Sequence, residues 1–202
     1  MLNLSVRDLW LARNTIIEML TDRGYIFEQS IFSQLEDFKN TFNLEDSTSC
    51  NFTAIRNVND KVILCAIHFT SNDKLSKKQI ETIITDYSNQ SISKLILISC
   101  NKLNHAALAY LDKSNFSIEL FLYKDILFNP TKHILVPHHK IMSIEEKTTL
   151  LNNLKCSLDD LPIILKKDVI AKYLGAELND VIEITRKSKT TGESKYYRVV
   201  KE

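Results

Sequence analysis

Histidine and cysteine are the side chains in this sequence best suited to bind a metal ion or to attack a substrate. The chain has four cysteines and five histidines: Cys50, Cys65, Cys100 and Cys156, with His68, His105, His133, His138 and His139. No two cysteines form a C-x-x-C pair, and no two histidines lie four residues apart on a predicted helix, the common zinc-site spacings. The adjacent His138 and His139 point in opposite directions in an extended chain. We therefore predict no metal site.

Carboxylates on neighbouring strands would indicate a metal-dependent nuclease, in which they hold Mg²⁺ and activate water. The two most apolar predicted strands, residues 61–69 and 94–100, contain no acidic residue. The three glycines, Gly24, Gly175 and Gly192, are too few for the phosphate-binding loops of nucleotide sites. We therefore expect no catalytic residue and no cofactor, and a nuclease-like enzyme is the weakest of the alternatives.

Hydrophobic periodicity divides the first part of the chain into helices and strands. Residues 5–23 predict a helix that Gly24 ends, residues 30–42 predict a second helix, and the polar residues 43–60 predict a loop or weak strand. Strands are expected at 61–69, 94–100 and 117–123, with helices from Ser76 to Tyr87 and over 103–111 between them. This alternation favours a parallel or mixed sheet flanked by helices, an α/β domain.

A break at Asn129-Pro130-Thr131-Lys132 marks the predicted domain boundary, which gives domains 1–131 and 132–202. After it, Ser143 and Glu146 form a capping box, and Asp168 begins a short helix that ends at Gly175. Strands over 181–186 and 196–200 are joined as a hairpin. The C-terminal part is therefore predicted to be a small α+β domain.

The overall composition is that of an ordinary folded protein. The hydrophobic fraction is 44% and the formal net charge is +1, which is far from the basic bias of a dedicated nucleic-acid-binding module. The apolar runs have the length of strands, so we expect no membrane span, and the first residues do not resemble a signal peptide. Separated cysteines in apolar runs suit a reducing compartment.

Motifs at both ends of the chain resemble one family. They read HILVPH from His133, SIEEK from Ser143, DLPI from Asp160, DVIAKYLG from Asp168, VIEITR from Val181, SKTTG from Ser188 and YRVV from Tyr197. Near the N-terminus they comprise Leu9-Trp10, Arg13, Thr15-Ile16 and Asp22-Arg23-Gly24-Tyr25. Together they resemble the two-domain subunit common to eukaryotic RNA polymerases I, II and III. Its C-terminal domain is similar to an archaeal polymerase subunit that lacks the N-terminal domain. Residues 43–115 match only in pattern.

The resemblance implies a non-catalytic subunit of a multisubunit DNA-directed RNA polymerase. It implies an α/β jaw domain near downstream DNA, with weak or indirect DNA contact, and an assembly domain that anchors the chain to the largest subunit within a heteromultimer. Transcription factors are further partners that it allows. The partner interface that it implies comprises His133, Leu135, Val136, Pro137, His138, Pro162, Asp168, Tyr173, Arg186, Ser188, Tyr197 and Arg198.

Departures from the family pattern in three motifs indicate a divergent polymerase. Lys189 and Glu193 reverse the charges that the family usually has at these positions. Ile163 and Lys172 stand where the family usually has arginine, and Val169 stands where it usually has proline. The abundance of Asn, Lys and Ile is typical of AT-rich coding and favours a large DNA virus. The expected location is a viral factory or virion in that case, and the nucleus for a cellular protein. The second alternative is a free adaptor of the same fold that binds transcription factors outside the enzyme.

Overall fold

The computed structural model describes residues 5–29, 31–42, 46–58, 61–70, 75–111, 114–188 and 192–202. The chain forms two compact units, an N-terminal unit, Met1–Phe128, and a C-terminal unit, Asn129–Glu202. The boundary predicted after residue 131 falls inside a short 3-10 helix, η3 (Pro130–Lys132). In the part of the chain that is described, no helix is long and apolar enough to cross a bilayer.

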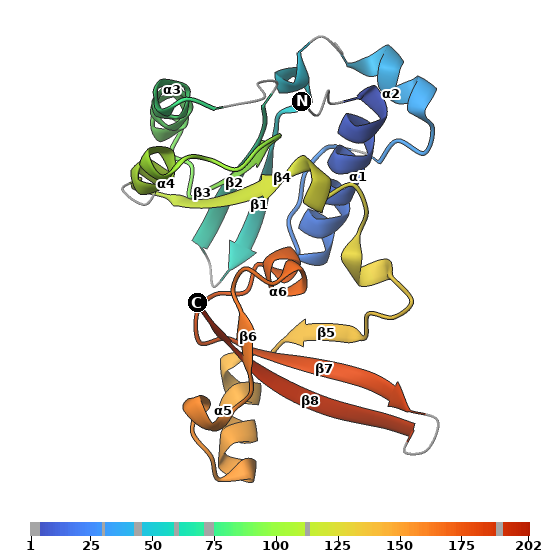
Figure 1. Ribbon diagram of the computed structural model, residues 1–202, viewed down its shortest axis with the longest axis vertical. Helices are drawn as coiled ribbons and strands as arrows, with labels where there is room; N and C mark the ends of the chain where they lie inside the picture. The colour runs from blue at the N-terminus through green and yellow to red at the C-terminus, as the bar shows by residue number, and fades with distance from the viewer. Residues whose placement is uncertain are drawn as a thin grey trace. The chain divides into compact units, whose positions relative to one another are not determined.

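The N-terminal unit contains a four-stranded mixed sheet in the order β1-β2-β3-β4 (Figure 1). Its strands are β1 (Phe52–Val58), β2 (Lys61–Phe69), β3 (Lys94–Ser99) and β4 (Ser117–Leu122). β1 runs antiparallel to β2, whereas β2, β3 and β4 are parallel. This mixed sheet with flanking helices confirms the predicted α/β class.

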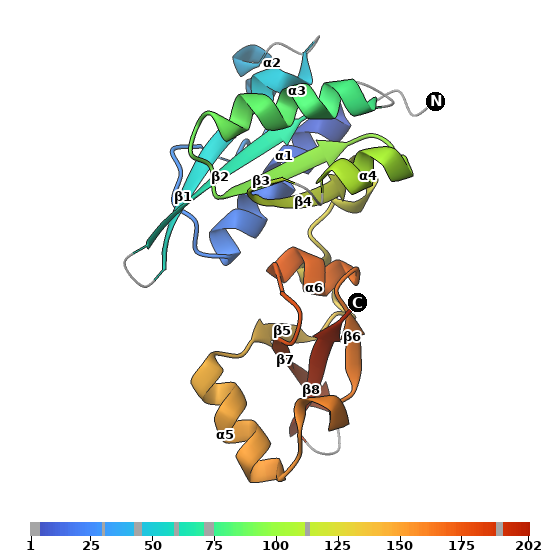
Figure 2. The ribbon, with the colours of Figure 1, turned by 90° about the vertical axis from the view of Figure 1, so that its left-hand side faces the viewer.

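Helices cover both faces of this sheet (Figures 1 and 2). One face carries α3 (Lys77–Ser88) and α4 (His105–Leu111), whose Ile80, Ile84 and Ala107 pack with Leu97 of β3. The other face carries α1 (Val6–Asp22), and α2 (Leu35–Thr41) packs beside α1. Capping boxes begin α1 and α3 because the side chains of Ser5 and Ser76 accept hydrogen bonds from backbone N–H groups that lack helical partners.

The expectation for the second helix was wrong in extent. The second helix begins at Leu35 rather than at Ser30, which itself lies outside the described residues. The backbone before it is held by α1, because the carbonyl of Phe32 accepts hydrogen bonds from Trp10 Nε1 and Asn14 Nδ2, each 2.8 Å long. Residues 52–58, expected to be a loop or weak strand, form the seven-residue strand β1. All of its residues pair with β2, from Phe52 to Val58, and this pairing holds the segment as a strand.

A buried arginine organises the contact between α1 and the segments that follow it. Arg13 is fully buried, and its guanidinium lies 5.2 Å, 4.7 Å and 5.7 Å from the ring centroids of Phe32, Phe42 and Phe52. Its Nη2 donates a 2.6 Å hydrogen bond to Gln29. Aromatic faces attract a cation, so burying a guanidinium among them carries a smaller free-energy penalty than burying it in an aliphatic core. Arg13 therefore acts as a core residue.

A buried carboxylate joins three elements of the same unit. Glu119 on β4 accepts from Arg23 Nη1 at 2.9 Å and from Lys94 Nζ at 2.5 Å, and only 16% of its side chain is exposed. Burial by itself raises the pKa of a carboxyl group, but the charges of Arg23 and Lys94 outweigh it and hold the pKa of Glu119 below the ordinary 4.5. Glu119 is therefore ionised at neutral pH and ties the end of α1 to the sheet.

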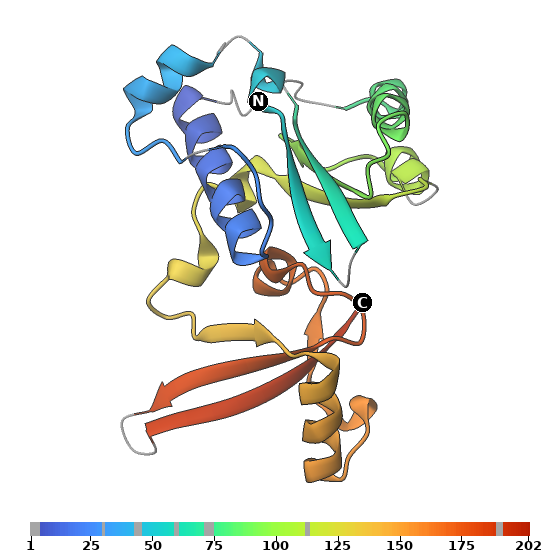
Figure 3. The ribbon, with the colours of Figure 1, turned by 180° about the vertical axis from the view of Figure 1, so that it is seen from behind.

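The C-terminal unit is a second four-stranded sheet with a helix on each face (Figure 3). Its strand order is β5-β7-β8-β6, with β5 (His138–Ile141), β6 (Ile163–Leu165), β7 (Val181–Ser188) and β8 (Gly192–Lys201). α5 (Ile144–Leu154) covers the face that contains Val181 and Val199. α6 (Val169–Leu174) covers the face that contains Ile182 and Val200. This arrangement confirms the predicted small α+β domain.

The motif from His133 to His138 would allow an extended strand, but its first residues form a turn before β5. Residues 133–136 form a turn in which the backbone N–H of Val136 donates to the carbonyl of His133 at 2.9 Å. The N–H of Leu135 donates to His133 Nδ1 at 3.2 Å. The hydrogen bond from the Leu135 N–H to the His133 side chain competes with strand pairing at that backbone N–H, and Pro137 has no N–H to donate to a neighbouring strand. The strand therefore begins only after the proline, at His138.

Replacing Glu119 by glutamine is expected to destabilise the N-terminal unit. The change leaves the largely buried Arg23 and Lys94 without a counter-charge, and breaking a buried ion pair from one side costs roughly 3 kcal/mol. Because the folded pKa of Glu119 is lowered, its contribution is complete above the ordinary glutamate pKa and is lost as the pH falls through the folded value. The measurement is thermal unfolding of the wild-type chain and of Glu119→Gln between neutral and acidic pH. The difference in stability between the two is expected to shrink on acidification.

The matched control is Glu81→Gln. Glu81 pairs with Lys77 at 3.4 Å on the surface of α3, where an ion pair is worth less than about 1 kcal/mol. Equal destabilisation by both glutamine variants would contradict the structural role given to Glu119.

Candidate functional site

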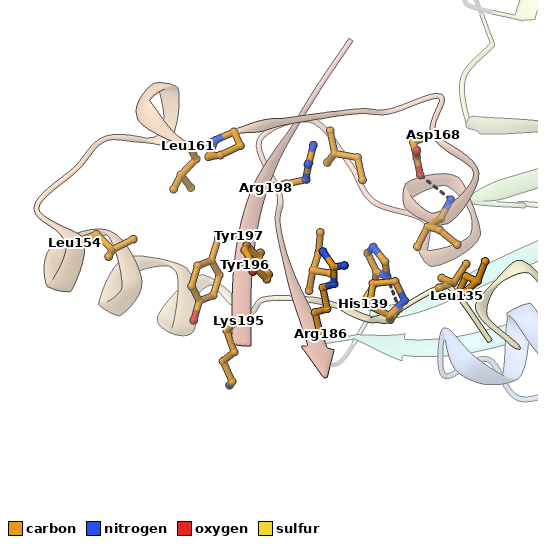
Figure 4. A pocket seen from close by; sticks show the side chains of 16 residues that line it. Leu135, His139, Leu154, Leu161, Asp168, Arg186, Lys195, Tyr196, Tyr197 and Arg198 are labelled. Carbon is orange, nitrogen blue, oxygen red and sulfur yellow. Dashed lines mark hydrogen bonds between the residues drawn. The ribbon is translucent and has the colours of Figure 1, made fainter. Parts of the chain in front are cut away.

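The C-terminal unit carries a shallow groove of about 750 Å³ (Figure 4). Its wall is built from the β7–β8 hairpin, the end of α5, the segment that leads into β6, the start of α6 and the turn before β5. All of the residues that line it belong to this one unit. The groove therefore depends on the packing of a single small sheet.

Strand alternation decides which side chains reach each side of this sheet, because successive residues point to opposite faces. Register pairs His139 with Ile184 and Ile184 with Tyr196, so these three lie on the face that α6 covers. Arg198 lies opposite Ile182 on the same face. Tyr197 points to the other face, where it packs with the cluster beneath α5.

Positive charge dominates the polar lining. Arg186 and Arg198 are exposed, and Arg186 makes no ion pair with a described residue. Arg198 Nη1 donates to the carbonyl of Ile163 at 3.0 Å, which fixes the direction of its guanidinium. Lys195 is paired with Glu183 at 3.1 Å. The acidic residue in the lining, Asp168, caps α6 by accepting from the N–H groups of Ile170 and Ala171.

Apolar side chains are exposed around the same groove. Leu135 is 82% exposed, Tyr196 52% and Leu154 52%, and all three line the groove. Among the described residues, nine of the fifteen large hydrophobic side chains that remain exposed belong to the C-terminal unit, which is just over a third of the chain. Exposed apolar side chains beside guanidinium groups are typical of a protein–protein interface.

The groove gathers most of the interface residues that the motifs implied. It is lined by Leu135, Val136, Pro137, Pro162, Asp168, Arg186, Tyr197 and Arg198. His133 and His138 are exposed but do not line it. Ser188 pairs with Gly192 at the far end of the hairpin.

Tyr173 belongs to the core and not to the surface. It is 3% exposed, and its hydroxyl accepts a 2.8 Å hydrogen bond from Asn129 Nδ2. Asn129 in turn caps η3 through its Oδ1, which accepts from the N–H of Thr131 at 3.0 Å. The motif position of Tyr173 therefore serves to hold η3 to α6, and we remove it from the set of contact residues.

Sequence reasoning missed His139, Tyr196 and Leu154, which line the groove. Tyr196 could have been found, because it lies two residues before Arg198 on a predicted strand and so shares its face. Leu154 ends α5 on a helix that has no fully buried residue, and only the tertiary fold brings it to the groove.

The side chains that could bind a metal ion or take part in catalysis have structural roles in the fold. Among the described residues, no three His, Cys, Asp or Glu side chains are placed to hold a metal ion. Asn51 Oδ1 accepts from the N–H of Phe69, so its Nδ2 donates to His68 Nδ1 at 3.0 Å. Burial lowers the pKa of His68, which keeps its imidazole neutral. His68 therefore serves as a structural residue of the sheet.

Sequence reasoning missed Glu119, the acidic residue on the third strand of the parallel part of the sheet. Its two carboxylate oxygens are occupied by Arg23 and Lys94. The side chain is thus committed to an ion pair and does not form the carboxylate pair that a two-metal nuclease needs.

Comparison with known proteins assigns both halves of the chain. Residues 3–87 match the family described as RNA polymerase Rpb5, N-terminal domain, and residues 128–200 match RNA polymerase Rpb5, C-terminal domain. The chain is 32% identical over 200 residues to DNA-directed RNA polymerases I, II, and III subunit RPABC1 of Caenorhabditis briggsae, with 95% of each chain covered. It is 31% identical over 193 residues to DNA-directed RNA polymerase V subunit 5A of Arabidopsis thaliana, covering 95% of this chain and 87% of the relative.

The two family matches follow the chain in the order of its two units, and the relatives align along nearly all of its length. With the groove and the mixed sheet already described, they lead to one conclusion. The chain belongs to the Rpb5 family of RNA polymerase subunits.

Proposed function

We propose that this chain is a non-catalytic subunit of a multisubunit DNA-directed RNA polymerase, anchored to the largest subunit through the groove of its C-terminal unit. The observation that carries the anchoring is the concentration of exposed apolar side chains and guanidinium groups on that unit. Leu135 is 82% exposed to water in the isolated chain, and covering such an apolar side chain with a partner contributes favourably to the free energy of binding. The relatives' printed names support a polymerase as the complex that supplies the partner.

The N-terminal unit takes a positional role in this proposal. Its buried charges, Arg13 and Glu119, are used for folding, which supports a unit that supplies surface and not a reactive group. By resemblance we assign it a place beside downstream DNA, with transcription factors as further partners. A net charge of +1 favours weak or indirect contact with that DNA.

The proposed location is the nucleus. The two relatives named above come from a nematode and a plant, and they give no support to the viral origin that the composition favoured. We therefore propose a cellular polymerase and do not carry the viral factory or virion forward.

Replacing Leu135 by aspartate is expected to weaken anchoring without unfolding the chain. Its side chain is almost fully exposed, so the fold loses little, whereas a charge facing an apolar partner costs roughly 2 kcal/mol, or about 30-fold in affinity. The measurement is an affinity pull-down of the tagged full-length chain from its source cells, with co-purifying large subunits identified and quantified. Val62→Asp is the matched control, because Val62 is 64% exposed but lies in the N-terminal unit. Equal losses in both variants, or none in either, would count against anchoring through the groove.

Replacing Tyr173 by phenylalanine distinguishes a role in the stability of the fold from a role in partner binding. The change removes the hydroxyl that accepts from buried Asn129, which is expected to cost about 1 kcal/mol of stability. Binding to the large subunits at a temperature well below unfolding should stay within about twofold of wild type. Thermal unfolding and the same pull-down measure the two effects. A large loss of binding with unchanged stability would return Tyr173 to the contact set.

A further inference from the structure

The β7–β8 hairpin is longer than both strands that flank it. β5 pairs with β7 only at Ile182–Thr185, and β6 pairs with β8 only at Val199–Lys201. From Gly192 to Arg198, β8 has β7 on one side and no described strand on the other. Figure 1 shows the hairpin extending past the ends of β5 and β6. The sheet therefore has an open position in line with β6.

The backbone groups that face this open edge can be assigned. The N–H of Val199 donates toward β6, to the carbonyl of Pro162 at 2.9 Å, and the N–H of Val200 donates the other way, to the carbonyl of Asp180 at 2.9 Å. N–H directions alternate along a strand, and the register of β8 with β7 is continuous from Val199 to Gly192. Lys195 and Tyr197 therefore direct their N–H and C=O groups to the open edge, whereas Tyr196 and Arg198 pair with β7.

The groove passes around the same edge. Tyr197, Leu161 and Leu154 line it from the face that α5 covers, and Tyr196 and Arg198 line it from the opposite face. A single groove can include both faces of β8 only where no neighbouring strand closes its edge. Figure 4 shows Tyr196, Tyr197 and Arg198 projecting from this strand. The open backbone and the two sets of side chains form one site.

The side chains around the edge define the chemistry of an occupant. On the α5 side they are apolar, with Leu154 and Leu161 beside Tyr197. On the α6 side Arg186 and Arg198 supply positive charge that Asp168 does not meet, because its carboxylate caps α6. An added strand would place alternate residues on the two faces of the sheet. The residues of that strand that face α5 would be apolar, and those that face α6 would be acidic or apolar.

We propose that an extended segment of a larger polymerase subunit, with alternating apolar and acidic residues, adds to the open edge of β8 as a further strand of this sheet. The inference rests on the proposed function and deepens it, because it names the binding mode. Main-chain hydrogen bonds to Lys195 and Tyr197 supply affinity, and the side chains on the two faces supply specificity. A second copy of this chain would bring like charges to Arg186 and Arg198, whereas an acidic segment complements them.

The first test blocks the edge at one residue. Lys195→Pro removes the outward N–H and places a ring in the path of an added strand, while the hydrogen bonds to β7 are made by the neighbouring residues. Lys195→Ala removes the same side chain and its ion pair with Glu183 but leaves the backbone unchanged. In pull-downs of the full-length chain, Lys195→Pro is expected to bind the large subunits at least about tenfold more weakly than Lys195→Ala.

The second test reads the backbone of the unmodified chain and does not depend on how the proline variant folds. Residue-resolved amide exchange of Lys195 and Tyr197 is expected to slow at least about tenfold when the chain is in the assembled polymerase. Tyr196 and Arg198 pair with β7 and should be protected in both states.

The outcomes separate the binding mode from the function. Equal binding by the two Lys195 variants, or unchanged exchange at Lys195 and Tyr197 in the assembled enzyme, would overturn strand addition and leave the subunit role intact. Failure of the wild-type chain to retain any large polymerase subunit would instead overturn the proposed function. A homodimer of the chain alone that Lys195→Pro abolishes would assign the edge to a second copy and also overturn the proposal.

Discussion

The pairing of β7 with β8 is the constraint on which the C-terminal unit depends. Val181, Ile182, Val199 and Val200 are all fully buried, and alternate members belong to the clusters under α5 and under α6. A slip of one residue in this register would exchange the two faces and expose both clusters at once. The same register directs Tyr196 and Arg198 to one face and Tyr197 to the other. The groove proposed as the interface is thus a direct product of the core, and the hairpin extends beyond that core.

The N-terminal unit solves a different problem, the burial of charge. Arg13 is surrounded by three phenylalanine rings, and Glu119 lies between Arg23 and Lys94. Burying a lone charge is costly, so each is compensated, one by aromatic faces and the other by opposite charges. An active site would need a carboxylate free to meet a metal or a substrate. Glu119 is instead committed to Arg23 and Lys94, so this buried acid serves the folding of the sheet.

Local features of the fold were predictable because their causes are local. The capping boxes at Ser76 and Ser143 and the cap at Asp168 begin helices at the expected residues, since a cap is decided within four positions of sequence. Features decided by distant partners were not predictable. Arg23 is 96 residues from Glu119, and the late start of α2 depends on a carbonyl held by α1. Motif residues located most of the groove, but only the three-dimensional fold separates exposed Arg198 from buried Tyr173, which pattern alone treats alike.

The binding site proposed on the backbone edge of β8 would also give physical meaning to the departures from the family pattern. Ile163, where the family usually has arginine, is 54% exposed, and its carbonyl still accepts the hydrogen bond from Arg198. Val169 stands at the first position of α6, where a proline would sacrifice no helical hydrogen bond, and Asp168 caps the helix without it. At both positions the main chain still takes part in these interactions, through the carbonyl of Ile163 and the capped start of α6. Recognition through N–H and C=O groups does not depend on side-chain identity, so the proposed strand addition would tolerate the surface changes of a chain that is about 30% identical to its relatives.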